Sequence, residues 1–151
     1  MKSDTIAAIA TALSDAGIGI IRISGPEAIA VANRVVVNKK KEHTLKNWQT
    51  HTIHYGFVEE NGTILDEVMV SVMKAPRSYT TEDTVEINCH GGVLLTKRVL
   101  EAVLHAGARM AEPGEFTKRA FLSGRIDLSE AEAVMELIQA KNQFSMPASI
   151  K

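Results

Sequence analysis

The dipeptide Asn61-Gly62 constrains the fold of this 151-residue chain more than any other feature of its sequence. It separates two strand-like runs, Thr52 to Glu59 and Thr63 to Met73. Asn-Gly supplies the positive φ angles that a tight two-residue turn between antiparallel strands requires. We therefore predict a β-hairpin here, and a sheet in which antiparallel pairing is prominent.

Three other segments have the composition of strands. The run from Gly17 to Gly25 is β-branched and bounded by glycines. Strand alternation places Arg22 on one face of it, with Ile21 and Ile23 on the other. The remaining strand-like segments are Asp4 to Thr11 and Thr84 to Cys89.

Helices are expected between and after these strands. Pro26 suits a first helical turn, because its missing N–H would have no partner there, and the apolar residues Ala28, Ile29, Ala32, Val35 and Val36 follow. A second helix begins after His90-Gly91-Gly92 and ends near Ala106-Gly107. Asp127 and Glu130 are spaced as a capping pair for a last helix over Leu128 to Ala140. Asn38 to Asn47 is expected to form a loop, and Phe144 to Lys151 has no pattern.

Strands and helices thus interleave around a hairpin. This order predicts an α+β domain with a mixed or mostly antiparallel sheet packed with helices, rather than a doubly wound parallel sheet.

Composition narrows the class of protein. The formal net charge of −1 disfavours a chain whose surface as a whole grips a nucleic-acid backbone. One cysteine, Cys89, excludes a disulfide framework and fits a reducing compartment. No secretory leader pattern or membrane-length apolar run is present, so we expect a cytoplasmic protein with no membrane partner.

The most unusual stretch runs from Glu112 to Asp127. It holds three cations and three anions, punctuated by one proline and two glycines. A plain core helix does not need that density of charge and turn residues. We interpret it as a binding surface built on a turn, a short helix and a second turn.

Two other positions carry candidate binding chemistry. Glu86, Asn88 and His90 share one face of a strand, which either lines a pocket or meets water. A carboxylate such as Glu86 accepts two parallel hydrogen bonds and suits a ligand with adjacent N–H donors, such as the edge of a pterin. Arg22 is the lone charge in an apolar strand, where it is either half of a structural ion pair or a ligand anchor.

Other candidate chemistry is weaker. Cys89 and His90 are strand neighbours that face opposite ways, so they are not expected to form a nucleophile–base pair. His90-Gly91-Gly92 is either an anion site at a helix N-terminus or a plain turn. The histidines lack metal-ligand spacing, Lys39 to Lys41 is expected to be a solvated loop, and no P-loop sequence occurs.

Four ordered segments resemble the N-terminal domain of the MnmE (TrmE) tRNA-modification GTPase family, and together they cover about Asp4 to Ala140. The segments are Gly17-Ile-Gly-Ile-Ile-Arg-Ile-Ser-Gly-Pro26, Ala75 to Gly92, Gly107 to Leu122 and Gly124 to Ala133. The third, which contains Glu112-Pro-Gly-Glu-Phe-Thr-Lys-Arg-Ala120, is the most specific.

This resemblance implies a fold similar to the tetrahydrofolate-binding fold of glycine-cleavage T-proteins. It also implies a module that binds 5-formyl-tetrahydrofolate or a related tetrahydrofolate and forms a homodimer. By motif position the folate contacts fall on Arg22, Glu86 and Arg125; no catalytic or metal-binding residue is implied. In the family a flavoprotein partner, MnmG (GidA), completes the complex that modifies the wobble uridine of tRNA.

The resemblance also sets expectations about extent. Residues 1–122 would be the folate-binding and dimerisation domain, and residues 123–151 its end together with the start of a truncated helical domain. The family's GTPase domain, which uses GTP, K+ and Mg2+, has no counterpart in these residues, so the chain is not expected to hydrolyse GTP alone. Two positions depart from the family: Ala12-Leu13-Ser14 replaces a Pro-Pro-Gly loop, and Thr81 replaces a usual glycine.

One alternative of another class stays open, a purely structural dimerisation or partner-docking domain. It would use an apolar stripe on the last helix, made of Leu128, Ala131, Val134, Met135 and Ile138. A stand-alone one-carbon transferase is disfavoured, because the sequence offers no well-supported general base.

Overall fold

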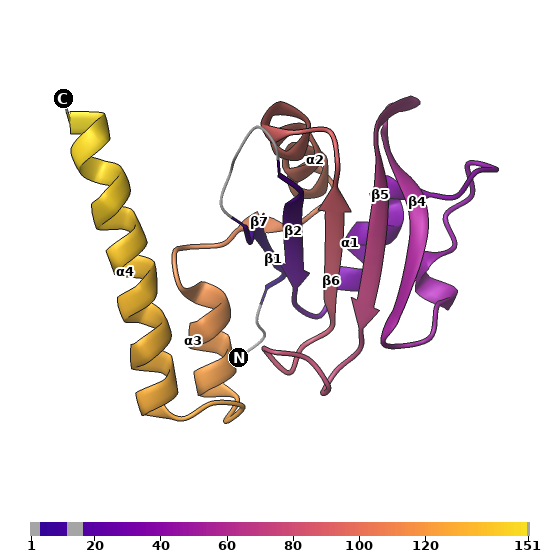
Figure 1. The fold of residues 1–151 in the computed structure, drawn as a ribbon. Coiled ribbons are helices and arrows are strands. Elements are labelled where there is room, and N and C mark those ends of the chain that lie inside the picture. Colours follow the sequence, from indigo (N-terminus) through magenta and orange to yellow (C-terminus); the bar gives the residue numbers. More distant parts are fainter. Residues whose placement is uncertain (1–3, 12–16, 151) are drawn as a thin grey trace. The chain divides into compact units, whose positions relative to one another are not determined.

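The computed structural model describes residues 4–11 and 17–150, with side chains described up to residue 140 (Figure 1). The departure at Ala12-Leu13-Ser14 therefore lies outside the described residues. Contacts divide the chain into two compact units. The first consists of Met1–Ser78 and Glu82–Met110, and the second of Tyr79–Thr81 and Ala111–Lys151.

The first unit is built on a sheet of seven described strands. These are β1 (Ile6–Ile9), β2 (Gly19–Ser24), β3 (Val36–Val37), β4 (Thr52–Glu60), β5 (Thr63–Met73), β6 (Thr84–Cys89) and β7 (Arg109–Met110). Their order across the sheet is β3-β4-β5-β6-β2-β1-β7. Only the β1–β7 pair among them is parallel, so the predicted α+β class with a mixed, mostly antiparallel sheet is confirmed.

The hairpin that anchors this topology is the one that Asn61-Gly62 predicts. Asn61 has φ 53° and Gly62 has φ 81°, and Glu60 pairs with Thr63 across the turn. Asparagine and glycine adopt these left-handed values at little cost, so the turn closes without strain. The register of β4 shifts once, between Val58 and Glu59.

Two helices, α1 (Ala28–Val35) and α2 (Val93–His105), cover one face of the sheet (Figure 1). The strand residues that face them are fully buried, and burying each such Val or Ile contributes about 1.5–3 kcal/mol. They include Ile21, Ile23, Val68, Val70, Val72, Val85, Ile87 and Cys89. The predicted alternation of β2 and β6 is thereby confirmed.

Local patterns misplace a few boundaries. Val36, assigned to the helical stripe, leaves α1 and pairs with Val58 as part of β3. The predicted loop Asn38 to Asn47 contains one turn of 3₁₀ helix, η1 (Leu45–Asn47), whose Leu45 is buried. Both differences arise because core burial, rather than local sequence preference, decides the conformation.

The second unit contains α3 (Glu115–Leu122) and α4 (Leu128–Ile150). Ala120, Ile126 and Ala131 are buried together, with Tyr79 packed against them. The predicted capping pair is present, since Asp127 Oδ1 accepts from Glu130 N at 2.7 Å and Glu130 Oε1 accepts from Asp127 N at 3.0 Å. Helix α4 runs past the predicted end at Ala140 to Ile150.

Among the described residues, no helix has both the length and the apolar character needed to span a bilayer.

Candidate functional site

The face of the sheet opposite α1 and α2 holds two of the three predicted site residues, in one row across the strands. Arg22 on β2 is the register partner of Glu86 on β6, and Glu86 is the partner of Ser71 on β5. Ala8 on β1 and Ile53 on β4 extend this row at its two ends. Because directly paired residues project to the same side of a sheet, these side chains share one surface.

Arg22 and Glu86 form a direct ion pair. Arg22 Nε donates to Glu86 Oε2 at 2.8 Å, and the side chains are 30% and 24% exposed. Both charges are therefore partly withdrawn from water but still reachable from it. Of the two interpretations of Arg22, the ion pair is present, and it orients a carboxylate that a ligand can also reach.

Asn88 provides the most informative atom of this surface. It lies two residues beyond Glu86 on β6, in the next row with Ile20 and Met69. Its Oδ1 is buried, and within the described residues it has no hydrogen-bond partner. Leaving a buried acceptor unpaired costs about 1–3 kcal/mol, so a water molecule or a ligand that donates to this atom would stabilise the structure.

Apolar side chains border these polar groups. On β4, Ile53 is 64% and Tyr55 is 49% exposed, and Tyr55 is the register partner of Met69. The Tyr55 hydroxyl donates to Glu67, and this hydrogen bond raises the pKa of Tyr55 above its usual value. The surface thus combines an oriented carboxylate and a buried amide oxygen with exposed apolar side chains.

The segment Cys89-His90-Gly91 is structural. Cys89 is fully buried, and burial followed by the charge of Asp66 raises the pKa of its thiol to about 12. The N–H groups of His90 and Gly91 both donate to Asp66 Oδ2, at 2.9 and 3.0 Å. An aspartate of the chain therefore occupies the position that the predicted anion at this turn would take.

Two charged residues of the Glu112–Asp127 stretch, Glu115 and Asp127, accept hydrogen bonds from backbone N–H groups near the starts of α3 and α4. The predicted order of turn, short helix and turn is present, with α3 between Gly114 (φ 77°) and Gly124 (φ 82°). Glu115 Oε1 accepts from Glu112 N at 2.9 Å, and Glu115 Oε2 lies 3.5 Å from Arg119.

Arg125, the third predicted site residue, is exposed in the turn after α3, and its N–H donates to Ala120 O at 2.9 Å. It belongs to the second unit, so its relation to Arg22 and Glu86 stays a prediction.

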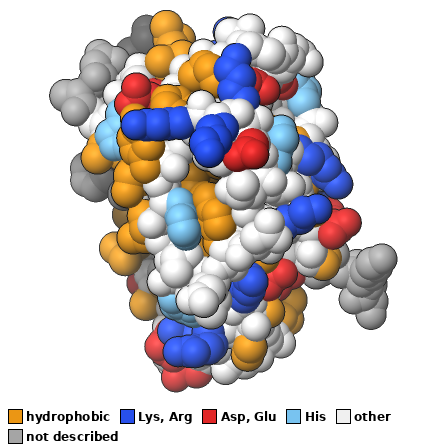
Figure 2. Space-filling view, turned by 90° about the vertical axis from the view of Figure 1, so that its right-hand side faces the viewer, with side chains coloured by type: hydrophobic (Ala, Val, Ile, Leu, Met, Phe, Trp, Pro, Cys, Tyr) orange, Lys and Arg blue, Asp and Glu red, His pale blue; other side chains and the backbone are white. Residues whose placement is uncertain are grey.

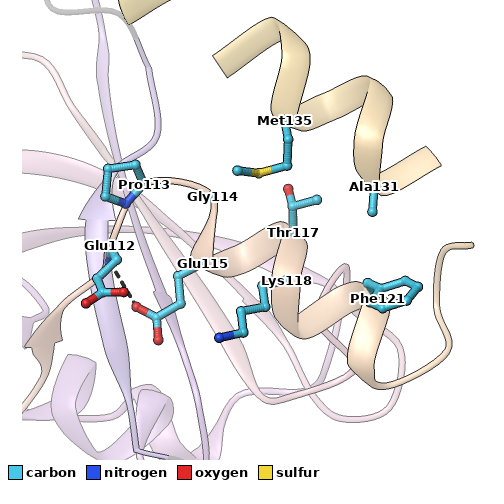
Figure 3. A pocket seen from close by; sticks show the side chains of 9 residues that line it. All are labelled: Glu112, Pro113, Gly114, Glu115, Thr117, Lys118, Phe121, Ala131 and Met135. Atoms are coloured by element: carbon cyan, nitrogen blue, oxygen red, sulfur yellow. Dashed lines mark hydrogen bonds between the residues drawn. The ribbon is translucent and has the colours of Figure 1, made fainter. Parts of the chain in front are cut away.

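A cavity of about 300 Å³ in the second unit escaped the sequence analysis (Figure 3). Met135 and Ala131 of α4 and Phe121 of α3 face it, and the Pro113-Gly114 turn closes one end. Part of the predicted apolar stripe of α4 therefore packs within the chain, since Ala131 is buried, whereas Leu128 is 57% exposed. The stripe is less available for docking a partner than its sequence indicated.

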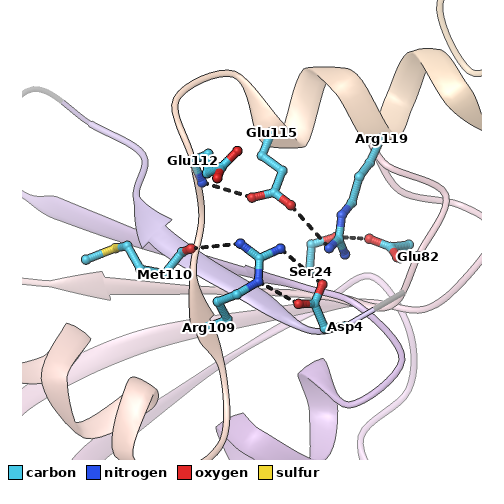
Figure 4. A network of polar contacts seen from close by, with 8 residues as sticks. All are labelled: Asp4, Ser24, Glu82, Arg109, Met110, Glu112, Glu115 and Arg119. Atoms are coloured by element: carbon cyan, nitrogen blue, oxygen red, sulfur yellow. Dashed lines mark hydrogen bonds and ion pairs between the residues drawn. The ribbon is translucent and has the colours of Figure 1, made fainter. Parts of the chain in front are cut away.

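Figure 4 draws polar contacts of residues from the first unit and from the second unit. In the first unit Arg109 donates through Nε and Nη2 to the carboxylate of Asp4, at 2.5 and 3.1 Å, which ties β7 to the residues before β1. Ser24 Oγ donates to Glu82 Oε1 at 2.9 Å. Among the described residues, no group of three or more His, Cys, Asp or Glu side chains is arranged to hold a metal ion.

The sequence of the chain is similar to those of known proteins. The chain matches the family described as GTP-binding protein TrmE N-terminus over residues 5–125. It is 60% identical over 151 residues to the tRNA modification GTPase MnmE of Lachnoclostridium phytofermentans, a match that covers 100% of this chain and 33% of that protein. The same-named protein of Bacillus subtilis is 55% identical over 145 residues, which cover 95% of this chain and 31% of that protein. The chain thus spans about a third of the length of the curated relatives it matches.

Proposed function

This chain belongs to the family of the GTP-binding protein TrmE N-terminus, and we propose that it serves tRNA modification by binding a 5-formyl-tetrahydrofolate-type cofactor on the helix-free face of its sheet. The relatives' shared name, tRNA modification GTPase, is consistent with a role in that process. The cofactor, the assembly and the site residues are our proposal.

The observation that carries this proposal is the unpartnered buried acceptor, Asn88 Oδ1, beside the oriented carboxylate of Glu86. A pterin ring presents adjacent N–H donors along one edge. Glu86 would accept from that edge, and the Asn88 amide would turn to accept a further N–H group. The residues present on this face therefore fit the proposed group, although Glu86 shares one oxygen with Arg22.

Each side chain has a distinct part in the proposal. Arg22 orients the Glu86 carboxylate through their ion pair, and its guanidinium can meet a ligand carbonyl. Ile53 and Tyr55 supply apolar area at the rim. The bound folate itself would supply the one-carbon unit, so these side chains bind and orient without acid–base work.

Arg125 is assigned to the cofactor through the family resemblance alone. Its exposed guanidinium would suit a carboxylate of the folate's glutamate tail. The proposed boundary at residue 122 falls between α3 and α4 and rests on the same resemblance.

We further propose that the chain forms a homodimer through its apolar surface. Ile18, Ile53 and Tyr55 are 53%, 64% and 49% exposed, and exposed apolar side chains mark an interaction surface where they form a patch. GTP hydrolysis with Mg2+ and K+, docking of the flavoprotein MnmG and engagement of tRNA would belong to the complete cytoplasmic assembly.

Sedimentation velocity with and without 5-formyl-tetrahydrofolate tests binding and assembly together. We expect a dimer whose dissociation constant falls when folate is added, because ligand binding to one state stabilises that state. Folate that sediments independently of the chain at millimolar concentration would overturn the cofactor assignment. A dimer that ignores folate but binds MnmG would favour the alternative, a purely structural docking domain.

A further inference from the structure

The segment between β3 and β4 carries a concentrated positive charge that the folate proposal does not use. Residues 38–51 contain four lysines, Lys39, Lys40, Lys41 and Lys46, and one acid, Glu42. This formal excess of three positive charges lies in a chain whose net charge is −1. All four lysines are exposed. The near-neutral total therefore conceals a segregated basic segment, which we call the lysine loop (residues 38–46).

The lysine loop is held in one conformation by Asn38. Asn38 Oδ1 accepts from the N–H groups of Lys40 and Glu42, both at 2.9 Å, and Lys41 N donates to Asn38 O at 2.9 Å. The only acid of the loop, Glu42, accepts from Asn38 Nδ2 at 3.1 Å. His43 Nδ1 lies 2.6 Å from Asn33 O and anchors the far end of the loop to α1. The lysines thus project from an ordered turn with their ammonium groups in water.

Trp48, the aromatic residue that follows the loop, packs against the protein and does not offer a free ring on which a nucleic-acid base could stack. The rings of Trp48 and His54 stack with centroids 3.8 Å apart, and Trp48 Nε1 donates to Thr44 Oγ1 at 3.3 Å. Trp48 also packs against the core of the first unit. Its polar group and a ring face are therefore already engaged, so this surface presents charge and not base-reading chemistry.

Figure 2 shows the side of the molecule that includes β4, where Lys and Arg side chains are spread from its upper part to its lower part and histidine lies beside hydrophobic side chains near its centre. Acidic side chains are scattered among them rather than forming a patch of their own.

We propose that the lysine loop is a docking surface for the phosphate backbone of RNA. This inference rests on the proposed role of the chain in tRNA modification, which brings it to an RNA substrate. Ordered, exposed lysines without base-reading side chains bind phosphates independently of sequence, and binding releases counterions from the RNA. The loop would then orient the substrate, while base identity is read elsewhere in the assembly.

The test measures binding of fluorescein-labelled bacterial tRNA to the full chain by fluorescence anisotropy, over 25–200 mM KCl. Lys39→Gln/Lys40→Gln removes two charges from the loop. Lys97→Gln/Arg98→Gln is the matched control, because it removes two adjacent exposed charges from α2. Lys39→Arg/Lys40→Arg keeps the loop's charge. Thermal unfolding of each variant checks that the fold is retained, as expected for exposed positions.

We expect the loop variant to weaken binding and to lower the slope of log K against log[salt] by about 1.5, at roughly 0.7–0.9 per lost phosphate contact. The α2 control and the arginine variant should keep the wild-type slope. Equal losses in the loop variant and the α2 control would overturn the proposal, since binding would then follow net charge alone. Unchanged tRNA binding by the loop variant would also overturn the proposal. If that variant no longer binds MnmG, the loop would be assigned to the contact with this flavoprotein.

Calorimetry of the loop variant with 5-formyl-tetrahydrofolate separates this inference from the proposed function. Unchanged folate binding together with weakened tRNA binding supports the lysine loop as a separate RNA surface. Loss of both would show a shared structural defect and overturn it. Absence of folate binding in every variant, with the loop-specific change of slope intact, would remove the folate assignment and leave the RNA surface.

Discussion

Arg22 Nε and Glu86 Oε2 lie 2.8 Å apart on antiparallel strands that are adjacent in the sheet but 64 residues apart in sequence. Both side chains keep about a quarter to a third of their surface exposed. An ion pair at such a position adds little to stability, because water screens it and two long side chains lose freedom. The pair is therefore expected to add little to the stability of the fold, and under the proposed function it orients Glu86 for a ligand.

A double-mutant cycle with Arg22→Met and Glu86→Gln tests this interpretation. We expect a coupling free energy of unfolding of about 1 kcal/mol or less, as for other solvent-accessible pairs. Urea unfolding of the four proteins measures it. A coupling of about 3 kcal/mol or more, typical of breaking a buried pair, would assign the two charges to the fold instead.

The sequence predicts this fold well wherever short-range chemistry decides the structure. Asn61-Gly62 determines the hairpin. The prediction of Thr84 to Cys89 matches β6 because the apolar and polar residues alternate within it and a His-Gly-Gly turn ends it. The two-residue edge strands β3 and β7 are not predictable locally, since they exist only through partners on β4 and β1.

The candidate site is predictable only in part for the same reason. Arg22 and Glu86 stand out as charges in strand-like segments, but their pairing depends on the register between β2 and β6. The unsatisfied oxygen of Asn88 can be found only once every neighbouring donor is placed. In the second unit, the charges around α3 suggested a binding surface, although Glu115 and Glu130 largely satisfy backbone N–H groups.

The thiol of Cys89 should be unreactive in the folded chain. A pKa of about 12 leaves roughly one thiol in ten thousand ionised at pH 8, and only the thiolate reacts with disulfide reagents. We expect negligible labelling by a colorimetric disulfide reagent in buffer and complete labelling in guanidinium chloride. Rapid labelling of the native chain would mean that the thiol is exposed.

The raised pKa of Cys89 also makes stability depend on pH. The unfolded thiol ionises near the ordinary thiol pKa of 9.0 while the folded one keeps its proton, so its contribution is complete below pH 9 and declines as the pH rises towards 12. Stability of the wild type should therefore fall more steeply above pH 9 than that of Cys89→Ala, as measured by urea unfolding. Parallel pH profiles would contradict the shift.

Replacement of Gly114 is expected to destabilise the second unit. It has φ 77°, and an added Cβ would lie 2.4 Å from Met135 Sδ. Gly114→Ala should cost about 2–3 kcal/mol, mostly from backbone strain, with a smaller part from moving the flexible thioether end of Met135. Gly124→Ala is the control, since it has φ 82° and open space around the added atom, and should cost about 1–2 kcal/mol. Equal losses in circular dichroism-monitored urea unfolding would show that Met135 moves aside freely.

Thr81 is a position where this chain can be stabilised. It is β-branched yet has φ 65°, a backbone region that costs such residues about 1–2 kcal/mol. Thr81→Gly should raise the free energy of unfolding by about 0.5–1 kcal/mol after the entropy of glycine is subtracted. Asn61→Gly, at φ 53°, should change it little because asparagine tolerates this region. A destabilised Thr81→Gly variant would show that the threonine side chain contributes more than its strain removes.

The most direct test of the proposed cofactor site is isothermal titration calorimetry of 5-formyl-tetrahydrofolate into the wild type, Glu86→Gln and the exposed-surface control Glu101→Gln. Replacing the carboxylate by an amide removes charge-assisted hydrogen bonds worth about 1.5–3 kcal/mol and turns a donor towards the donors of the pterin. We predict measurable binding by the wild type and by Glu101→Gln, with affinity reduced about 10- to 100-fold in Glu86→Gln. Equal affinities for all three proteins would contradict the proposal that Glu86 reads the cofactor.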